Sequence, residues 1–211
     1  MRIAAIFVLI LLSSVQSRAA ELTQLADCQG WFGDASCVFE ALGHRFTVGA
    51  QGHGCRYRSE ALCESFDLSQ RQHVQMRWLS FIEYQSDLLL ITECNFGDGG
   101  FTRVLRLDGE DLRVLWSVHI SAFNPSRGLV EESSVYLSAI GFVGKLDLEN
   151  GNLLWQHDNL YERATGCFNS FNSPELIGSL VVFTESSHRR HSGDERRQIR
   201  VDRKTGEVIP R

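Results

Sequence analysis

The stretch Val143-Gly-Lys-Leu-Asp-Leu-Glu-Asn-Gly-Asn-Leu-Leu-Trp155 decides the fold. It reads as a short strand ending in Asp, a tight turn at Asn150-Gly151, and a second strand ending in Trp, because Asn-Gly tolerates the positive φ angles of a hairpin turn. Similar apolar-Asp, turn, apolar-Trp patterns end at Trp116 and Trp78, and the three tryptophans are 38 and 39 residues apart. A repeat of about 40 residues with this ending is typical of β-propeller blades.

The repeat predicts an all-β fold: a small or partial β-propeller of about four blades, each with three to four antiparallel strands. The blades are expected at roughly 40–78, 79–116, 117–155 and 156–211. The expected strands are 45–49, 62–68 and 74–78 in the first blade, 88–93, 101–108 and 112–116 in the second, 134–139, 143–148 and 153–155 in the third, and 180–185, 197–202 and 207–209 in the fourth. Residues 20–39 are expected either to add a strand or to cover one face.

The first 19 residues are expected to be a cleaved export signal. Arg2 precedes an apolar run from Ile3 to Leu12, and small residues follow at Ser17 and Ala19. The run is shorter than the roughly 20 residues that a membrane-spanning helix needs. We therefore expect residues 20–211 to be a single soluble domain in the periplasm or outside the cell.

The charge balance argues against some partners. Without Arg2 and Arg18 the chain has 19 basic residues against 26 acidic ones, a net charge of about −7. A negative protein is a poor ligand for nucleic acid or for an anionic membrane surface, so neither is expected as a partner.

The six cysteines are expected to form disulfides, which an exported chain favours. They are Cys28, Cys37, Cys55, Cys63, Cys94 and Cys167. The spacing suggests Cys55 with Cys63 inside a hairpin and Cys94 with Cys167 across one face, which leaves Cys28 with Cys37. No pair has the C-x-x-C spacing of a zinc or redox site, so no metal is expected there. A reactive thiol is the functional alternative.

Two copies of one motif carry a family resemblance. They are Gly144-Lys-Leu-Asp147 with Asn150-Gly-Asn-Leu-Leu-Trp155, and Ile199-Arg-Val-Asp202 with Lys204-Thr-Gly-Glu207. These resemble the blades of the pyrroloquinoline-quinone-type (PQQ-like) propeller repeat family, over roughly residues 85–209 and more weakly over 40–84. The resemblance implies that Trp78, Trp116 and Trp155 dock between neighbouring blades. Quinone enzymes of this type have about eight blades and adjacent paired cysteines, which this chain lacks, so no cofactor is expected.

In a propeller, the loops between second and third strands and the connectors between blades share one face. This arrangement predicts that loops 52–60, 94–100, 156–172 and 186–197 lie together. Loop 186–197 carries two histidines and four arginines, and arginine's planar guanidinium suits carboxylates. The candidate partner-binding residues are Arg56, Tyr57, Arg58, His188, Arg189, Arg190 and His191. The alternative is a solvated hairpin in which Asp194 and Glu195 neutralise the loop's own charges.

The strand-end carboxylates are expected to cap turns, not to bind metal. They are Asp67, Asp108, Asp147 and Asp202. The segment Asn95–Gly100 is expected to be a hairpin tip, because it lacks the features of phosphate and calcium loops. No catalytic motif such as G-x-S-x-G or H-E-x-x-H is present.

The sequence therefore predicts a non-catalytic, exported binding module that holds a protein or a small acidic ligand on its loop face. An envelope assembly factor and a toxin-immunity protein both fit this description. One alternative is a quinone- or other cofactor-dependent oxidoreductase relative. Another is one half of a homodimeric propeller, since four blades are few for a closed ring.

Overall fold

The computed structural model describes residues 24–29, 36–59, 62–69, 75–96, 99–160, 169–186 and 197–210. These residues form strands β1 to β16 and no helix, which confirms the all-β prediction. No helix in this described part is long and apolar enough to cross a membrane.

The strands form four antiparallel sheets. Sheet I contains β2 (Ser36–Ala41), β3 (His44–Gly49), β4 (His53–Ser59) and β5 (Leu62–Asp67). Sheet II contains β1 (Gln24–Gln29), β6 (Gln75–Tyr84), β7 (Asp87–Phe96), β8 (Gly99–Leu107) and β9 (Val114–Ile120). Sheet III contains β10 (Leu129–Glu131), β11 (Ser134–Ala139), β12 (Phe142–Asp147) and β13 (Leu153–His157). Sheet IV contains β14 (Glu175–Ile177), β15 (Leu180–Thr184) and β16 (Gln198–Asp202).

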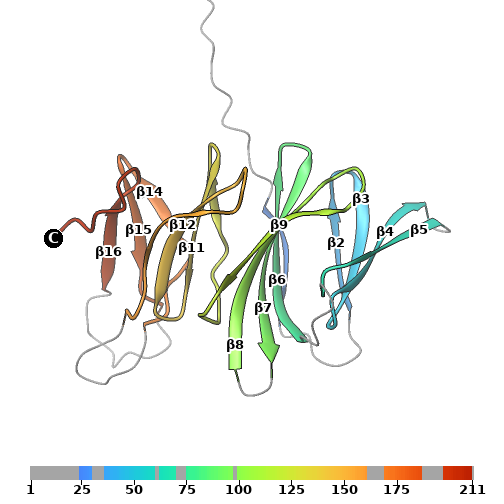
Figure 1. Cartoon of the computed structure of the whole chain (residues 1–211), viewed down its shortest axis with the longest axis horizontal. Helices are drawn as coiled ribbons and strands as arrows, with labels where there is room; N and C mark the ends of the chain where they lie inside the picture. The colour runs from blue at the N-terminus through green and yellow to red at the C-terminus, as the bar shows by residue number, and fades with distance from the viewer. Residues whose placement is uncertain are drawn as a thin grey trace, which may run out of the picture.

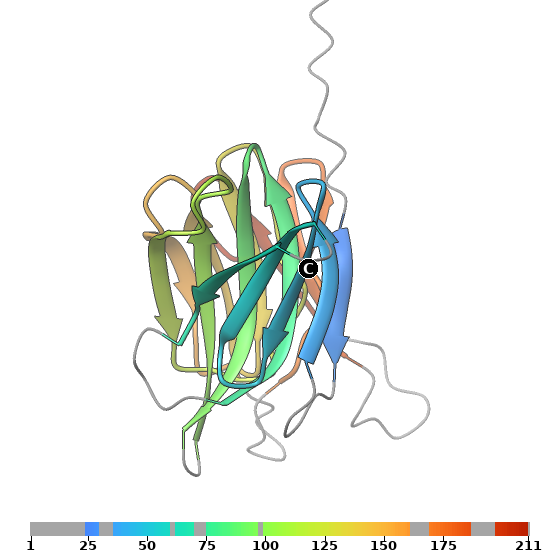
Figure 2. The same ribbon diagram turned by 90° about the vertical axis from the view of Figure 1, so that its right-hand side faces the viewer.

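The four sheets stand in a row, with sheets I and IV at opposite ends (Figure 1). A view turned by 90° looks along this row, so that the sheets lie behind one another (Figure 2). Each sheet acts as one blade, and the row is a small, partial propeller. The segment before the first predicted strand contributes two strands: β1 pairs with β6 in sheet II, and β2 pairs with β3 in sheet I.

The core consists of three apolar layers, one between each pair of neighbouring sheets. Alternate residues of a strand point to opposite faces, so the central strands contribute to two layers. In β7, for example, Leu88 and Leu90 face sheet I, whereas Leu89 and Ile91 face sheet III. This double burial explains the uninterrupted apolar run at Leu88–Ile91.

The predicted first blade is wrong in its last strand. The residues around Trp78 do not end sheet I but lie in β6, the strand of sheet II that pairs with β7. A two-residue turn at Gln85-Ser86 joins β6 and β7 into a hairpin, whereas β5 is the fourth strand of sheet I. The spacing before Trp78 therefore imitates the repeat without sharing its structure.

The disulfide prediction is confirmed for Cys55–Cys63, which joins β4 to β5. Cys37 is also disulfide-bonded, and its partner's side chain lies outside the described residues. The Cys94–Cys167 bridge is wrong: Cys94 is a free thiol. Its side chain points from β7 into the layer between sheets I and II and is fully buried. Cys167 itself lies outside the described residues.

We expect the Cys94 thiol to resist iodoacetamide in the folded protein and to react after unfolding. Burial raises its pKa from 9.0 to about 11, and only the thiolate is a good nucleophile. Because the folded pKa exceeds the unfolded one, this thiol also contributes stability that is lost as pH rises from about 9 through 11. Peptide mass spectrometry of Cys94 with and without urea measures the protection, and equal labelling in both would contradict its burial.

At each of the three junctions between neighbouring sheets, one cationic side chain donates a hydrogen bond to a backbone carbonyl of the next sheet. Arg56 on β4 donates to the Gly109 carbonyl at 2.6 Å. Arg106 on β8 donates to the Leu148 carbonyl at 2.7 Å, and Lys145 on β12 donates to the Arg203 carbonyl at 3.0 Å. Each cation lies on the second-to-last strand of its sheet, and each acceptor directly follows a strand-end Asp of the next sheet. We call these three contacts the inter-sheet clasps.

The strand-end carboxylates cap the turns, as predicted. Asp108 Oδ1 accepts from the Glu110 amide at 2.8 Å, and Asp147 Oδ1 accepts from the Glu149 amide at 2.7 Å. Asp67 and Asp202 make equivalent bonds. Backbone hydrogen bonds lower the pKa values of Asp108 and Asp202, because they stabilise the ionised carboxylate. Among the described residues, no three His, Cys, Asp or Glu side chains gather as a metal site.

Candidate functional site

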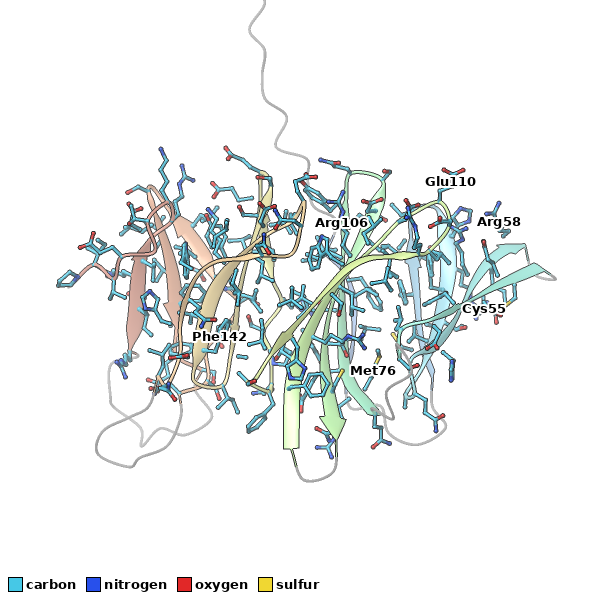
Figure 3. All side chains as sticks on the ribbon, viewed as in Figure 1. Cys55, Arg58, Met76, Arg106, Glu110 and Phe142 are labelled. Atoms are coloured by element: carbon cyan, nitrogen blue, oxygen red, sulfur yellow. A yellow bond between two sulfur atoms is a disulfide. The ribbon has the colours of Figure 1, made fainter. Side chains whose placement is uncertain are left out.

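The row of sheets has two different ends. The turns that follow Asp108, Asp147 and Asp202, the first marked by Glu110 in Figure 3, form one end, which we call the turn end, whereas Asp67 lies at the opposite end beside the β3–β4 turn. The other end, near Met76 and Phe142 in the same view, carries the β7–β8 and β11–β12 hairpins and the connectors that leave β9 and β13. We call it the loop end, and the sequence predicted that such segments share one face.

A pocket of about 430 Å³ opens at the loop end between sheets II and III. Its apolar lining residues are Ile120, Ala122, Phe123, Ile140, Phe142 and Leu153. Its polar lining residues are His119, Ser121, Gln156, Asp158 and Asn159, and Gly141 completes it. The sequence singled out none of these residues as a binding residue, although Gln156, Asp158 and Asn159 belong to loop 156–172, which was expected on the binding face.

Backbone hydrogen bonds hold three separate segments together around the pocket. The Ile140 amide donates to the Phe123 carbonyl at 2.8 Å, which ties the β11–β12 turn to the connector after β9. The Leu160 amide donates to the Gly141 carbonyl at 3.0 Å, which ties the same turn to the connector after β13. Asn159, in the second connector, has a φ of 53°, a left-handed conformation that Asn tolerates better than most residues. The pocket walls are therefore fixed by the fold.

Two exposed apolar side chains stand at the pocket. Phe123 is 45% exposed and Leu153 is 40% exposed, although most other large apolar residues are buried. Phe123 leans on Gly100, where an added Cβ would come within 3.0 Å of the Phe123 Cβ. Exposed aromatic and aliphatic side chains beside a recess are typical of a surface that binds another molecule.

The polar rim of the pocket is neutral to acidic. Asp158 Oδ1 accepts from the Asn159 side-chain amide at 3.0 Å. The His119 ring stacks on Phe101, with centroids 4.0 Å apart. The described lining contains one carboxylate and no lysine or arginine. Such a rim suits an apolar group flanked by hydrogen-bond donors.

A second polar cluster lies close to Phe123 at the loop end. The side-chain amide oxygen of Asn95 accepts from the Arg77 guanidinium, and the backbone N–H of Asn124 donates to the Glu93 carboxylate. Burial raises the pKa of Glu93, and the Arg77 charge opposes this shift. The cluster contains one acidic and one basic side chain, so its charges balance.

Arg56, Tyr57 and Arg58 do not lie on a loop, so their predicted place on the loop face is wrong. They lie in β4, next to the turn end, where Figure 3 shows Arg58 near Glu110. Arg56 is only 2% exposed because it forms an inter-sheet clasp and pairs with Glu64 at 2.5 Å. Hydrogen bonds from Arg56 and Arg58 lower the pKa of Glu64.

The other predicted partner-binding residues, His188, Arg189, Arg190 and His191, lie outside the described residues. The three tryptophans of the repeat lie between sheets. Trp78 and Trp116 pack on the layer between sheets II and III, and Trp155 packs on the layer between sheets III and IV. The Trp116 indole also donates to the Leu148 carbonyl at 2.9 Å, beside the Arg106 clasp.

Comparison with solved structures finds propeller-type folds. The quinohemoprotein alcohol dehydrogenase ADHIIG from Pseudomonas putida HK5 aligns with 15% identity and a TM-score of 0.53, over 89% of this chain and 35% of that chain. BamB from Moraxella catarrhalis aligns with 12% identity and a TM-score of 0.39, over 89% of this chain and 66% of that one. The computationally designed Ika4 protein aligns with 13% identity and a TM-score of 0.46, over 75% and 89%.

The similarity to the dehydrogenase supports the propeller-type fold and nothing finer. The chain spans about a third of the dehydrogenase's length, and identities this low carry no activity or partner. No protein-family model matches the sequence, and no curated protein matches it. The resemblance to PQQ-like propellers therefore holds at the level of the fold.

Proposed function

We propose that this protein is a non-catalytic binding module that holds a protein partner at its loop end. The observation that carries the proposal is the rigid pocket between sheets II and III, with exposed Phe123 and Leu153 beside it. Its volume lies within the range of small binding sites. Loops on a rigid β scaffold are the usual place for recognition.

The pocket favours a protein partner over the small acidic ligand that the sequence also suggested. An acidic ligand needs cationic side chains, and the described lining supplies Asp158 instead. Within this class of function, an envelope assembly factor and a toxin-immunity protein both remain proposals. Export to the periplasm or beyond agrees with the Cys55–Cys63 disulfide.

We find less support for the alternative that this chain is one half of a homodimeric propeller than for a single chain whose four sheets form an open row. The outer face of sheet I presents Glu40 and Arg45 together with the half-exposed Val38, on the side opposite the core residues Phe39 and Phe46. The outer face of sheet IV presents Thr184, Gln198 and Arg200, on the side opposite Phe183 and Ile199. These two faces are mostly polar, and polar outer faces are typical of the capping repeats that end a stack. The oxidoreductase alternative rests on fold similarity alone.

The proposal predicts that a photo-crosslinker at the loop end captures one protein partner in the cells that produce this chain. Benzoylphenylalanine at Ser121, an exposed lining residue, should give a discrete higher-mass adduct on a denaturing gel. The matched control carries the same group at exposed Asp111 at the turn end and should give none. Adducts of equal yield from both sites, or none from either, would contradict a loop-end partner.

A further inference from the structure

We propose that the pocket between sheets II and III takes one large apolar side chain from an extended segment of the partner, with a lysine or arginine beside it. This inference rests on the proposed function and specifies the chemistry of its partner. It follows from three features of the pocket: its apolar walls, its acidic rim, and the open strand edge beside it.

The apolar walls select the side chain. Ile120 and Ala122 contribute buried apolar atoms from sheet II, and Phe142 contributes them from sheet III. Phe123 and Leu153 extend the same surface to solvent. A Phe, Tyr, Leu or Met side chain entering this recess would remove its own apolar area and that of Phe123 and Leu153 from water. A polar side chain would gain little there.

The polar rim of the pocket favours a positive charge on the partner, next to the bound apolar side chain. Asp158 is exposed at the pocket, and one of its oxygens already accepts from Asn159. A carboxylate has further lone pairs, so Asp158 still offers acceptor capacity to a cation. In the polar cluster close to Phe123, the Arg77 guanidinium balances the Glu93 carboxylate. An acidic segment would meet Asp158 without a compensating cation among the described lining residues.

The open edge of sheet III favours an extended segment. Strand β13 is the last strand of its sheet, and no described residue pairs with its outer edge. Leu153 and Gln156 of this strand line the pocket. A peptide lying along β13 would find free backbone donors and acceptors while its alternate side chains point towards the pocket.

The test is an NMR titration of the isotope-labelled, full-length processed chain with three acetylated and amidated pentapeptides: Gly-Lys-Phe-Lys-Gly, Gly-Glu-Phe-Glu-Gly and Gly-Lys-Ser-Lys-Gly. We expect the Lys-Phe-Lys peptide to shift the amides of Ser121, Gly141 and Gln156. The Lys-Ser-Lys peptide should give no saturable shifts there. The Glu-Phe-Glu peptide should bind about fivefold more weakly, the size expected for one exposed charge pair.

Variants assign the effect to the pocket. Asp158→Asn should remove the preference for Lys-Phe-Lys over Glu-Phe-Glu, whereas Asp111→Asn at the turn end should preserve it. Ser121→Trp should fill the opening and abolish the shifts, and an unchanged thermal midpoint would show that this variant folds. These substitutions lie at exposed positions, so folding should survive them.

Several results would overturn the inference. They are equal affinity for the Glu and Lys peptides, shifts confined to other surfaces, binding of the Ser peptide as strong as that of the Phe peptide, and no binding of any peptide. The proposed function fails separately. If crosslinking from Ser121 still captures a partner after any of these results, the loop end binds a protein by other chemistry, and only the pocket inference is lost.

Discussion

Replacing Trp155 with Ala is expected to lower the free energy of unfolding by about 3–5 kcal/mol, the usual cost of truncating a packed large aromatic. The indole lies between sheets III and IV, with ring centroids 6.0 Å from Tyr136 and 6.4 Å from Phe183. Gly206 packs directly against it, since an added Cβ would come within 2.5 Å of the Trp155 ring. Removal of the ring would open a cavity between these two sheets. Urea denaturation followed by circular dichroism measures the loss.

A pair of milder variants separates packing from hydrogen bonding. The Trp155 Nε1 is buried and has no hydrogen-bond partner in the described structure, whereas the Trp116 Nε1 donates to Leu148. We therefore expect Trp116→Phe to lose about 1 kcal/mol more than Trp155→Phe, the typical net value of one hydrogen bond. A neutral Trp155→Ala variant would show that sheets III and IV do not pack as described.

The third repeat could be predicted from sequence because its signals are local. The Asn150-Gly151 turn predicts the β12–β13 hairpin without help from distant residues, and β11 to β13 lie within two residues of the expected bounds. The alternation of apolar and polar residues in Ser134–Ala139 suggested one buried face, but all six residues are buried because sheets II and IV cover both faces of β11. The first repeat could not be predicted in this way. The interval between Phe66 and Trp78 imitates the repeat, but pairing with β7 places Trp78 in the next sheet.

The pocket was beyond sequence reasoning for a different reason. Its walls come from the end of β9, the β11–β12 turn and β13, which meet only when sheets II and III pack. No single segment carries a signature. The exposed Phe123 beside Asn124-Pro125 is the one local signal, because a large aromatic in a polar connector invites a functional explanation.

Arg56 shows how charge alone misleads. In the sequence Arg56-Tyr-Arg58 looks like a cationic loop, but in β4 Arg56 and Arg58 lie on one face and both donate to Glu64. Arg56 is buried because it also reaches the Gly109 and Glu110 carbonyls of sheet II, whereas Arg58, near the end of the strand, is exposed. Only the register of β4 against β3 and β5 distinguishes a clasp from a binding residue.

Replacing Arg106 with Met is expected to cost about 3–5 kcal/mol, the range for removing one partner of a buried ion pair. Arg106 and Asp87 side chains are each 10% exposed and form a pair at 2.7 Å. The same guanidinium donates to the Leu148 carbonyl and lies 5.1 Å from the centre of the Tyr84 ring. Its loss would leave Asp87 charged in the junction between sheets II and III. Chemical denaturation measures the change.

Arg200 supplies the matched control for this prediction. It occupies the position of Arg106 in the repeat, on the face of sheet IV that has no described neighbour sheet, and its guanidinium donates to Gln198 of the same strand. Arg200→Met should therefore change the free energy of unfolding by less than about 1 kcal/mol. Adding Asp87→Asn to Arg106→Met should recover part of the loss, because the stranded carboxylate carries much of the cost. Equal losses of unfolding free energy from Arg106→Met and Arg200→Met would mean that the cation stabilises only its own sheet. The inter-sheet clasp would then not contribute to the packing of sheet II on sheet III.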